Sequence, residues 1–294
     1  MAEICGSPFP FGARIASDEH EIRLKAIDEV FDWLKNQKKF DIDDGKKLWY
    51  VLLNGLWKTG GWKNQHALAK KLSSILQEDF PEDSNIQKET IISSFFLCFG
   101  KEWGSLDKWR IEKFLVLVRQ FVNAIIEWTK NSDKLDYLPS LFREVLALDN
   151  CVGLQQQFVD VITDPLHDLM KLDLKMYKEK ENSTLKEPAD FLKPFSALFA
   201  DSHSKPALVI RINDLIIDPL VSSDGETLFG NDIDAILHFM RGLISKLNTS
   251  LKQNETNAKV SQIRYDTAAR VRQLIADILK AREEAGAPPE KSTD

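Results

Sequence analysis

Apolar residues recur at a spacing of three and four along nearly the whole chain, and this periodicity is the feature that most restricts the possible folds. The spacing places them on one face of an α-helix, whereas a half-buried β-strand needs strict alternation. The periodic segments run for about 12 to 25 residues between short polar connectors. Only VIRINDLIID, residues 209–218, has a composition that also suits a strand. The chain is therefore predicted to be all-α.

The periodicity predicts about eleven helices. Asp18 and Glu21 are spaced as in a capping box at the start of the first helix, and Ser105 is the predicted cap of the fifth. Pro165 predicts a kink or a break in the seventh. In chain order, the helices are expected at about 18–36, 48–56, 68–80, 84–100, 105–129, 138–146, 154–169, 189–199, 206–220, 233–247 and 260–278.

Successive amphipathic helices with short connectors are typical of stacked helix pairs. The repeats follow no fixed period, so the predicted fold is an irregular HEAT-like helical-repeat solenoid, forming a single domain over residues 17–285. Residues 1–16 are predicted to be an extended arm because of their prolines, with Phe9 and Phe11 available to fill a groove on the first helices. The tail, residues 286–294, and the loop 222–232 are predicted to lack regular structure.

Composition excludes several classes of protein. The 43% of hydrophobic residues are too many for a disordered chain, and a net charge of −6 gives no global positive field for gripping nucleic acid. Three cysteines without a C-x-x-C spacing indicate neither a disulfide framework nor a zinc site, and favour a reducing compartment. Without a signal-like start or a run of eighteen apolar residues, the chain is expected to be neither secreted nor membrane-spanning.

Residues 95–128 join an apolar helix end, a Trp-Gly turn and a long helix with two apolar stripes, which predicts a central helix covered by more than one neighbour. Trp62 and Trp103 lie in turns beside glycines. Each either wedges between helix pairs or presents an anchor to a partner. The other five tryptophans lie within helical patterns and are predicted to be core residues: Trp33, Trp49, Trp57, Trp109 and Trp128.

No catalytic, cofactor-binding or metal-binding residue is predicted. The chain has no glycine-rich phosphate loop, H-E-x-x-H or G-x-S-x-G motif. Cys98 lies in the apolar run FFLCF, which indicates a buried and inert thiol. The pair His167 and Asp168 carries catalytic residue types, but adjacent residues on a helix point apart.

Pairs of lysines mark the other candidate contacts. Lysines near helix ends are favoured by the helix dipole, and they also suit RNA phosphates. The candidate RNA contacts are Lys46, Lys47, Lys70 and Lys71.

Four stretches cover most of residues 11–221: FGARIASDEHEIRLKAIDEVFDWL, KKLWYVLLNGLWKTGGWKNQHALAKKLSSIL, FFLCFGKEWGSLDKWRIEKFLVLVR and, more loosely, FLKPFSALFADSHSKPALVIRINDLIIDPLV. They resemble the eukaryotic nucleolar ribosomal RNA processing protein one family, also described as the fifty-two-kilodalton nucleolar protein family. The most specific part is the signature E-W-x-x-[ILV]-D-x-x-R-x-[DE]-K-[FY]. It is met by Glu102, Trp103, Leu106, Asp107, Arg110, Glu112, Lys113 and Phe114.

The resemblance implies a non-catalytic assembly factor of the precursor large (60S) ribosomal subunit, located in the nucleus and nucleolus and required for pre-rRNA processing. It implies a helical scaffold whose partners are other assembly factors, including Brix-domain and WD-repeat proteins, with a candidate pre-rRNA contact and no membrane or cofactor. The candidate partner contacts are Glu102, Trp103, Asp107, Arg110, Lys113 and Trp62. Asp107 and Arg110 are expected to brace the turn as an ion pair.

Two other hypotheses remain open from the sequence. The first is a protein that binds RNA directly through its lysine clusters. The second is a hydrolase or nuclease with an unrecognised site, which a convergent carboxylate cluster with a metal would support.

Overall fold

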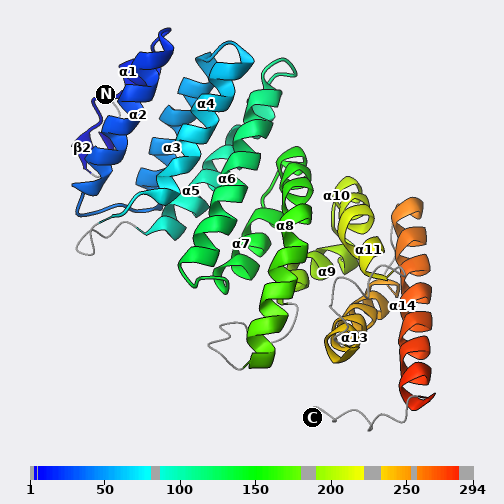
Figure 1. Ribbon diagram of the computed structural model, residues 1–294. Coiled ribbons are helices and arrows are strands. Elements are labelled where there is room, and N and C mark those ends of the chain that lie inside the picture. The colour runs from blue at the N-terminus through cyan, green and yellow to red at the C-terminus, as the bar shows by residue number, and fades with distance from the viewer. Residues whose placement is uncertain are drawn as a thin grey trace. The chain divides into compact units, whose positions relative to one another are not determined.

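The computed structural model describes residues 3–4, 6–80, 87–179, 190–221, 233–252 and 257–284 (Figure 1). The regular elements in these ranges are helices, apart from one two-stranded sheet. The predicted all-α class is thereby confirmed. None of the helices in these ranges combines the length and the hydrophobicity that a membrane span requires. The predicted loop at 222–232 and the predicted tail at 286–294 lie outside the described residues.

Contacts divide the chain into two compact units, residues 1–134 with 147–161 and residues 135–146 with 162–294. In a repeat array each helix pair contacts only its neighbours, so such a division is expected even within one array. The assignment of residues 17–285 to a single domain stays a prediction.

The first unit begins with strands β1 (Glu3–Ile4) and β2 (Ser7–Pro8), paired antiparallel, and the short helix α1 (Gly12–Ile15). The segment predicted to be extended over residues 1–16 thus contains a hairpin, which turns at Gly6 with a φ of 69°, and one helical turn. Phe9 and Phe11 are buried, and their ring centroids lie 5.4 and 6.2 Å from that of Trp33. Their predicted packing on the first helices is confirmed.

Successive helix pairs stack in this unit, since α2 contacts α4, α3 contacts α5 and α4 contacts α6. Trp49 of α3 lies in the core, with its ring 4.8 Å from Phe95 and 5.0 Å from Phe121, and it donates a hydrogen bond to the carbonyl of Ile91 (2.9 Å). Phe121 belongs to α6, which thus packs against α3 and α5 as well as α4. The prediction of a central helix covered by more than one neighbour is confirmed. The helices are α2 (His20–Lys35), α3 (Ile42–Lys58), α4 (Trp62–Ser73), α5 (Lys88–Glu102), α6 (Ile111–Asn131) and the start of α8 (Val152–Glu179).

A buried cation joins two helices of the second unit. Arg264 donates hydrogen bonds to the carbonyls of Phe199 (2.7 Å) and Asp201 (2.6 Å), which close the end of α9. Pro165 lies inside α8 without breaking it. Besides the rest of α8, the helices are α7 (Tyr137–Leu146), α9 (Lys193–Ala200), α10 (Pro206–Ile212), α11 (Asp218–Val221), α13 (Ile233–Ser250) and α14 (Ala258–Glu284).

The structure corrects three local expectations. The strand alternative for residues 209–218 is wrong, because α10 continues through a π-helical turn at Asn213–Ile217 into α11. Asp18 makes no capping box, since α2 starts after Glu19, which has no side-chain cap. Ser105 does not cap the fifth helix, because its hydroxyl donates to the carbonyl of Glu102 (2.7 Å) and α6 begins only at Ile111.

Two helix glycines offer a matched test of this packing. A Cβ on Gly55 of α3 would lie 2.7 Å from Cγ2 of Ile15 and 2.9 Å from its carbonyl oxygen, whereas a Cβ on Gly242 of α13 would meet nothing within 4 Å. We expect Gly55→Ala to cost about 1–3 kcal/mol of stability through overpacking against α1. Gly242→Ala should instead stabilise by about 0.5–1 kcal/mol through helix propensity. Urea unfolding of both variants measures the difference, and equal effects would contradict the close approach.

Candidate functional site

The signature residues form the turn between α5 and α6. A 3₁₀ turn at Trp103–Ser105 follows α5, and Asp107 then organises the start of α6. Oδ1 of Asp107 accepts hydrogen bonds from the backbone N–H groups of Trp109 and Arg110, both at 2.9 Å. Its Oδ2 pairs with the guanidinium of Arg110 at 2.5 Å. The predicted bracing ion pair is therefore present.

Lys113 attaches this turn to the end of α3. Its side chain is 6% exposed, and Nζ donates hydrogen bonds to the carbonyls of Trp57 and Thr59, the latter at 3.1 Å. The partial negative charge at a helix C-terminus favours a cation there. Burial lowers the pKa of Lys113. Arg110 adds a second contact with the same helix end, since its guanidinium lies 4.6 Å from the centroid of the Trp57 ring.

Trp103 acts as a wedge within the first unit. Its ring lies 5.3 Å from that of Phe99, and a Cβ on Gly153 at the start of α8 would lie only 2.7 Å from the indole nitrogen. The absence of a side chain at Gly153 thus makes room for the indole. Of the two alternatives that the sequence left for Trp103, these contacts favour the wedge.

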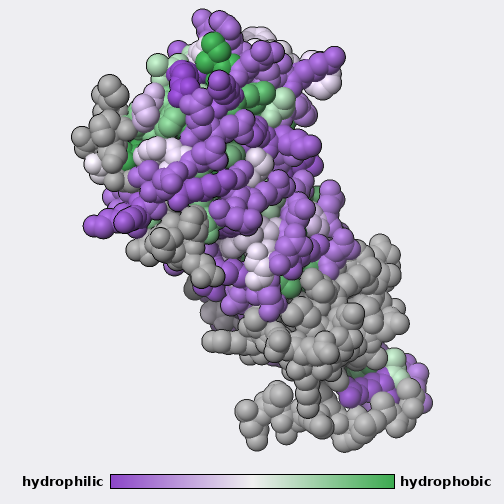
Figure 2. All heavy atoms as spheres, turned by 60° about the vertical axis from the view of Figure 1, so that its left-hand side comes forward, coloured by the Kyte–Doolittle hydropathy of each residue, from purple (hydrophilic) through white to green (hydrophobic). Residues whose placement is uncertain are grey.

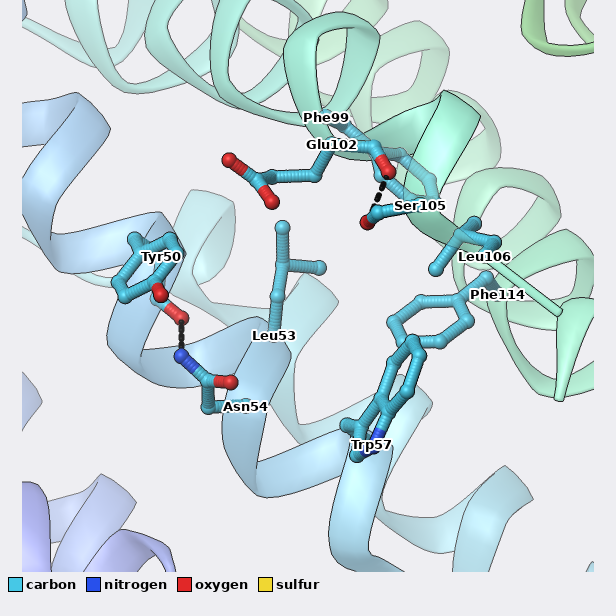
Figure 3. Close-up of a pocket in the computed structure, with 9 residues that line it drawn as sticks. All are labelled: Tyr50, Leu53, Asn54, Trp57, Phe99, Glu102, Ser105, Leu106 and Phe114. Carbon is cyan, nitrogen blue, oxygen red and sulfur yellow. Dashed lines mark hydrogen bonds between the residues drawn. The ribbon is translucent and has the colours of Figure 1, made fainter.

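A groove lies between α3 and the signature turn, with a volume of about 350 Å³ (Figure 3). Apolar side chains from both sides line it, and the carboxylate of Glu102 extends from the end of α5 toward α3, above Leu53. Tyr50 is 52% exposed on the α3 side. The lining residues are Tyr50, Leu53, Asn54, Trp57, Phe99, Glu102, Ser105, Leu106 and Phe114. Sequence reasoning found Glu102 but missed Tyr50 and Asn54, because nothing local in α3 marks them as neighbours of the turn.

The tryptophans do not all behave as predicted. Trp49 and Trp128 are buried as expected, and Trp33 and Trp57 are half-buried. Trp109 was expected in the core and is 82% exposed, because it precedes α6 in the turn that Asp107 fixes, outside the helical periodicity. Trp62, at the start of α4, is 67% exposed. Each of these two exposed rings has a lysine beside it: Nζ of Lys108 lies 4.8 Å from the Trp109 ring, and Nζ of Lys63 lies 5.9 Å from the Trp62 ring.

Three of the four candidate RNA-contacting lysines pair with carboxylates. Lys46 pairs with Asp43 at 2.5 Å, Lys47 approaches Asp44 at 4.0 Å, and Lys71 pairs with Asp28, while Lys70 is exposed. Their role in binding RNA stays a prediction.

Cys98 is buried in α5, and burial raises the pKa of its thiol to about 12. This agrees with the inert thiol predicted from its apolar surroundings, since the thiolate is the reactive form. Within the described ranges, no group of three or more His, Cys, Asp or Glu side chains is placed to hold a metal ion.

A family model described as "Nucleolar protein, Nop52" matches residues 7–272. The chain belongs to this family. The resemblance read from the signature is confirmed, and the description of the Nop52 family agrees with the predicted nucleolar location.

Curated relatives of the chain carry related names. It is 26% identical over 168 residues to "Ribosomal RNA processing protein 1 homolog" from Caenorhabditis elegans, and the aligned residues cover 53% of this chain and 41% of the relative. It is 24% identical over 169 residues to "Ribosomal RNA processing protein 1 homolog B" from Homo sapiens, and the aligned residues cover 53% of this chain and 22% of that relative. The chain therefore spans less than half the length of these relatives.

Replacing Lys113 tests its attachment role. We expect Lys113→Met to lower stability by about 2 kcal/mol, because hydrogen bonds from a charged group are lost and a buried carbonyl is left unpaired. Lys108→Met, on an exposed turn residue, should change stability by less than about 0.5 kcal/mol. Urea unfolding followed by tryptophan fluorescence measures both, and equal stabilities would show that the carbonyls find other donors.

The lowered pKa of Lys113 also predicts a pH effect, which a comparison of the parent chain with Lys113→Met would measure. Because the pKa of Lys113 is lowered in the folded protein, the unfolded chain holds this proton more tightly. Stability should therefore rise with pH between the lowered pKa and lysine's ordinary value of about 10.4. The rise should be smaller in Lys113→Met, and parallel pH profiles would contradict a buried, titrating Lys113.

Proposed function

We propose that the chain is a non-catalytic assembly factor of the precursor 60S particle that takes part in pre-rRNA processing as a protein-binding helical scaffold. Membership of the Nop52 family and the names of its relatives support this context. The observation that supports the scaffold role is the structural part that the signature residues play. Trp103, Arg110 and Lys113 contact neighbouring helices instead of converging on a reacting centre. Asp107 braces the turn that presents them.

The charge distribution favours proteins over RNA as the main partners. The chain has a net charge of −6, and three of the four candidate RNA-contacting lysines already have carboxylate partners. Figure 2 shows a face on which the described residues are mostly hydrophilic, with hydrophobic side chains in small separate areas. Such a surface suits partner proteins that bind at local grooves and charged residues. We propose that these partners are other assembly factors, of the Brix-domain and WD-repeat classes.

Purification of the tagged chain from its own cells tests this function. We expect precursor large-subunit proteins and pre-rRNA to copurify with it, and their absence would contradict the proposed function. Arg110→Glu should reduce this copurification and lower thermal stability, because it opposes Asp107 and removes the cation from the Trp57 ring. Arg119→Glu is the matched control, since it makes the same charge change on the exposed side of α6 and should leave both readouts unchanged.

Direct RNA binding is the second candidate function. The two exposed tryptophans with adjacent lysines, Trp62 with Lys63 and Trp109 with Lys108, favour it, because single-stranded nucleic acids stack on aromatic rings within basic surfaces.

Binding of a single-stranded RNA of about 20 nucleotides separates the two candidates. If the chain is chiefly a protein scaffold, the isolated protein should bind this RNA with a Kd above about 10 μM at physiological salt. Neither Trp109→Ala nor the double change Lys70→Glu and Lys71→Glu should then alter binding. Tight, salt-sensitive binding that these changes abolish would favour direct RNA recognition.

A further inference from the structure

The groove between α3 and the signature turn has the composition of a recognition site for a protein segment. Leu53 of α3, Phe99 of α5 and Phe114 of α6 are buried and form its apolar floor. The partly exposed Trp57 and Leu106 supply the accessible apolar surface beside it. The volume of about 350 Å³ lies near the lower end of pockets that hold ligands, about 300–1,000 Å³. One or two large side chains would fill it.

Glu102 provides a negative charge at this apolar surface. Its backbone carbonyl accepts the Ser105 hydroxyl (2.7 Å), so the residue is held at the end of α5. Figure 3 shows its carboxylate directed over the groove toward α3. In the described part of the chain this carboxylate has no ion-pair partner, whereas the nearby Asp107 is neutralised by Arg110. A cation brought by a ligand would therefore find an available counter-charge.

Aromatic rings complete the arrangement. Tyr50 lies half-exposed on the α3 side, and Trp57 lines the groove below it. The Trp57 ring already has the guanidinium of Arg110 against it, at 4.6 Å from the ring centroid. Planar guanidinium groups stack on such rings and pair with carboxylates through two parallel hydrogen bonds, which favours arginine over lysine as the incoming cation.

We propose that this groove binds a segment of a partner protein in which an arginine adjoins a large apolar residue. The apolar side chain packs over the floor formed by Leu53, Phe99 and Phe114, and the arginine pairs with Glu102 beside the Tyr50 ring. The inference rests on the proposed scaffold function and specifies where one partner binds. An RNA strand suits the groove less well, because the unpaired carboxylate repels phosphate.

Photo-crosslinking in intact cells tests the groove directly. The full-length chain would carry the photoreactive amino acid p-benzoylphenylalanine in place of Tyr50, a replacement that keeps an aromatic ring at an exposed position. Mass spectrometry of the crosslinked peptides then identifies the segment that lies in the groove. We expect a peptide from another protein with an arginine beside a large apolar residue. Crosslinks to RNA, to a second copy of the chain or to segments without a basic residue would overturn the proposal, as would the absence of any crosslink.

Dependence on Glu102 is the second part of the test. Glu102→Gln in the crosslinking chain should lower the yield of that peptide about tenfold, because a charge-assisted pair is lost. Glu112→Gln makes the same change at an exposed position outside the groove lining and should leave the yield unchanged. Thermal unfolding of both variants should match the parent chain, which separates a recognition role from a structural one. Equal crosslinking yields in the two variants would overturn the role of Glu102.

The two proposals fail in different ways. If the chain copurifies with precursor particles but Tyr50 gives no such crosslink, the groove assignment is wrong and the scaffold function stands. If the crosslink forms but no precursor particle copurifies, the groove binds its segment in another context and the proposed function is wrong.

Discussion

The attachment of Lys113 to the end of α3 is the interaction on which the first unit depends. Thr59, which ends this helix, has an extended conformation with φ −77° and ψ 121°, so no left-handed residue turns back at that position to cap the final carbonyls. The ammonium group of Lys113 takes the carbonyls of Trp57 and Thr59 instead. Because Lys113 lies in the first turn of α6, this bond fixes the start of that helix against the end of α3. The groove lined by Trp57 and Phe114 follows from this fixed approach.

In the second unit, a buried cation likewise binds the carbonyls at the end of a helix. Asp201, after α9, is also extended, with φ −79° and ψ 119°. Arg264 of α14, 1% exposed, takes the carbonyls of Phe199 and Asp201. In each unit a buried cation from a later helix therefore closes an earlier helix that lacks a left-handed cap. Such a bond joins helices that are distant in sequence, so it adds tertiary order as well as satisfying buried acceptors.

The sequence predicted what depends on local periodicity and missed what depends on distant partners. The apolar spacing placed α2 and α7 well, since burial of one face decides where a helix can form. The capping roles of Asp18 and Ser105 were wrong, because a short polar side chain serves whichever backbone group the turn brings near. The role of Lys113 could not be seen, because its partner Thr59 is 54 residues away. Tyr50 and Glu102 likewise meet across one groove only after α3 and α5 have packed.

Charged residues of the signature differ in whether the folded chain already supplies them with a partner. Lys113 is buried on backbone carbonyls, and Asp107 and Arg110 neutralise each other at the turn. A substitution at any of these three positions therefore disturbs folding before it can report on recognition. Glu102 differs, because its carboxylate extends over an open apolar groove and needs no partner for the helices to pack. Unpaired charge beside exposed aromatic surface is the arrangement in which binding energy can be gained without first breaking an internal bond. The same turn that holds the scaffold together thus presents, on its groove side, the one signature carboxylate that we assign to recognition.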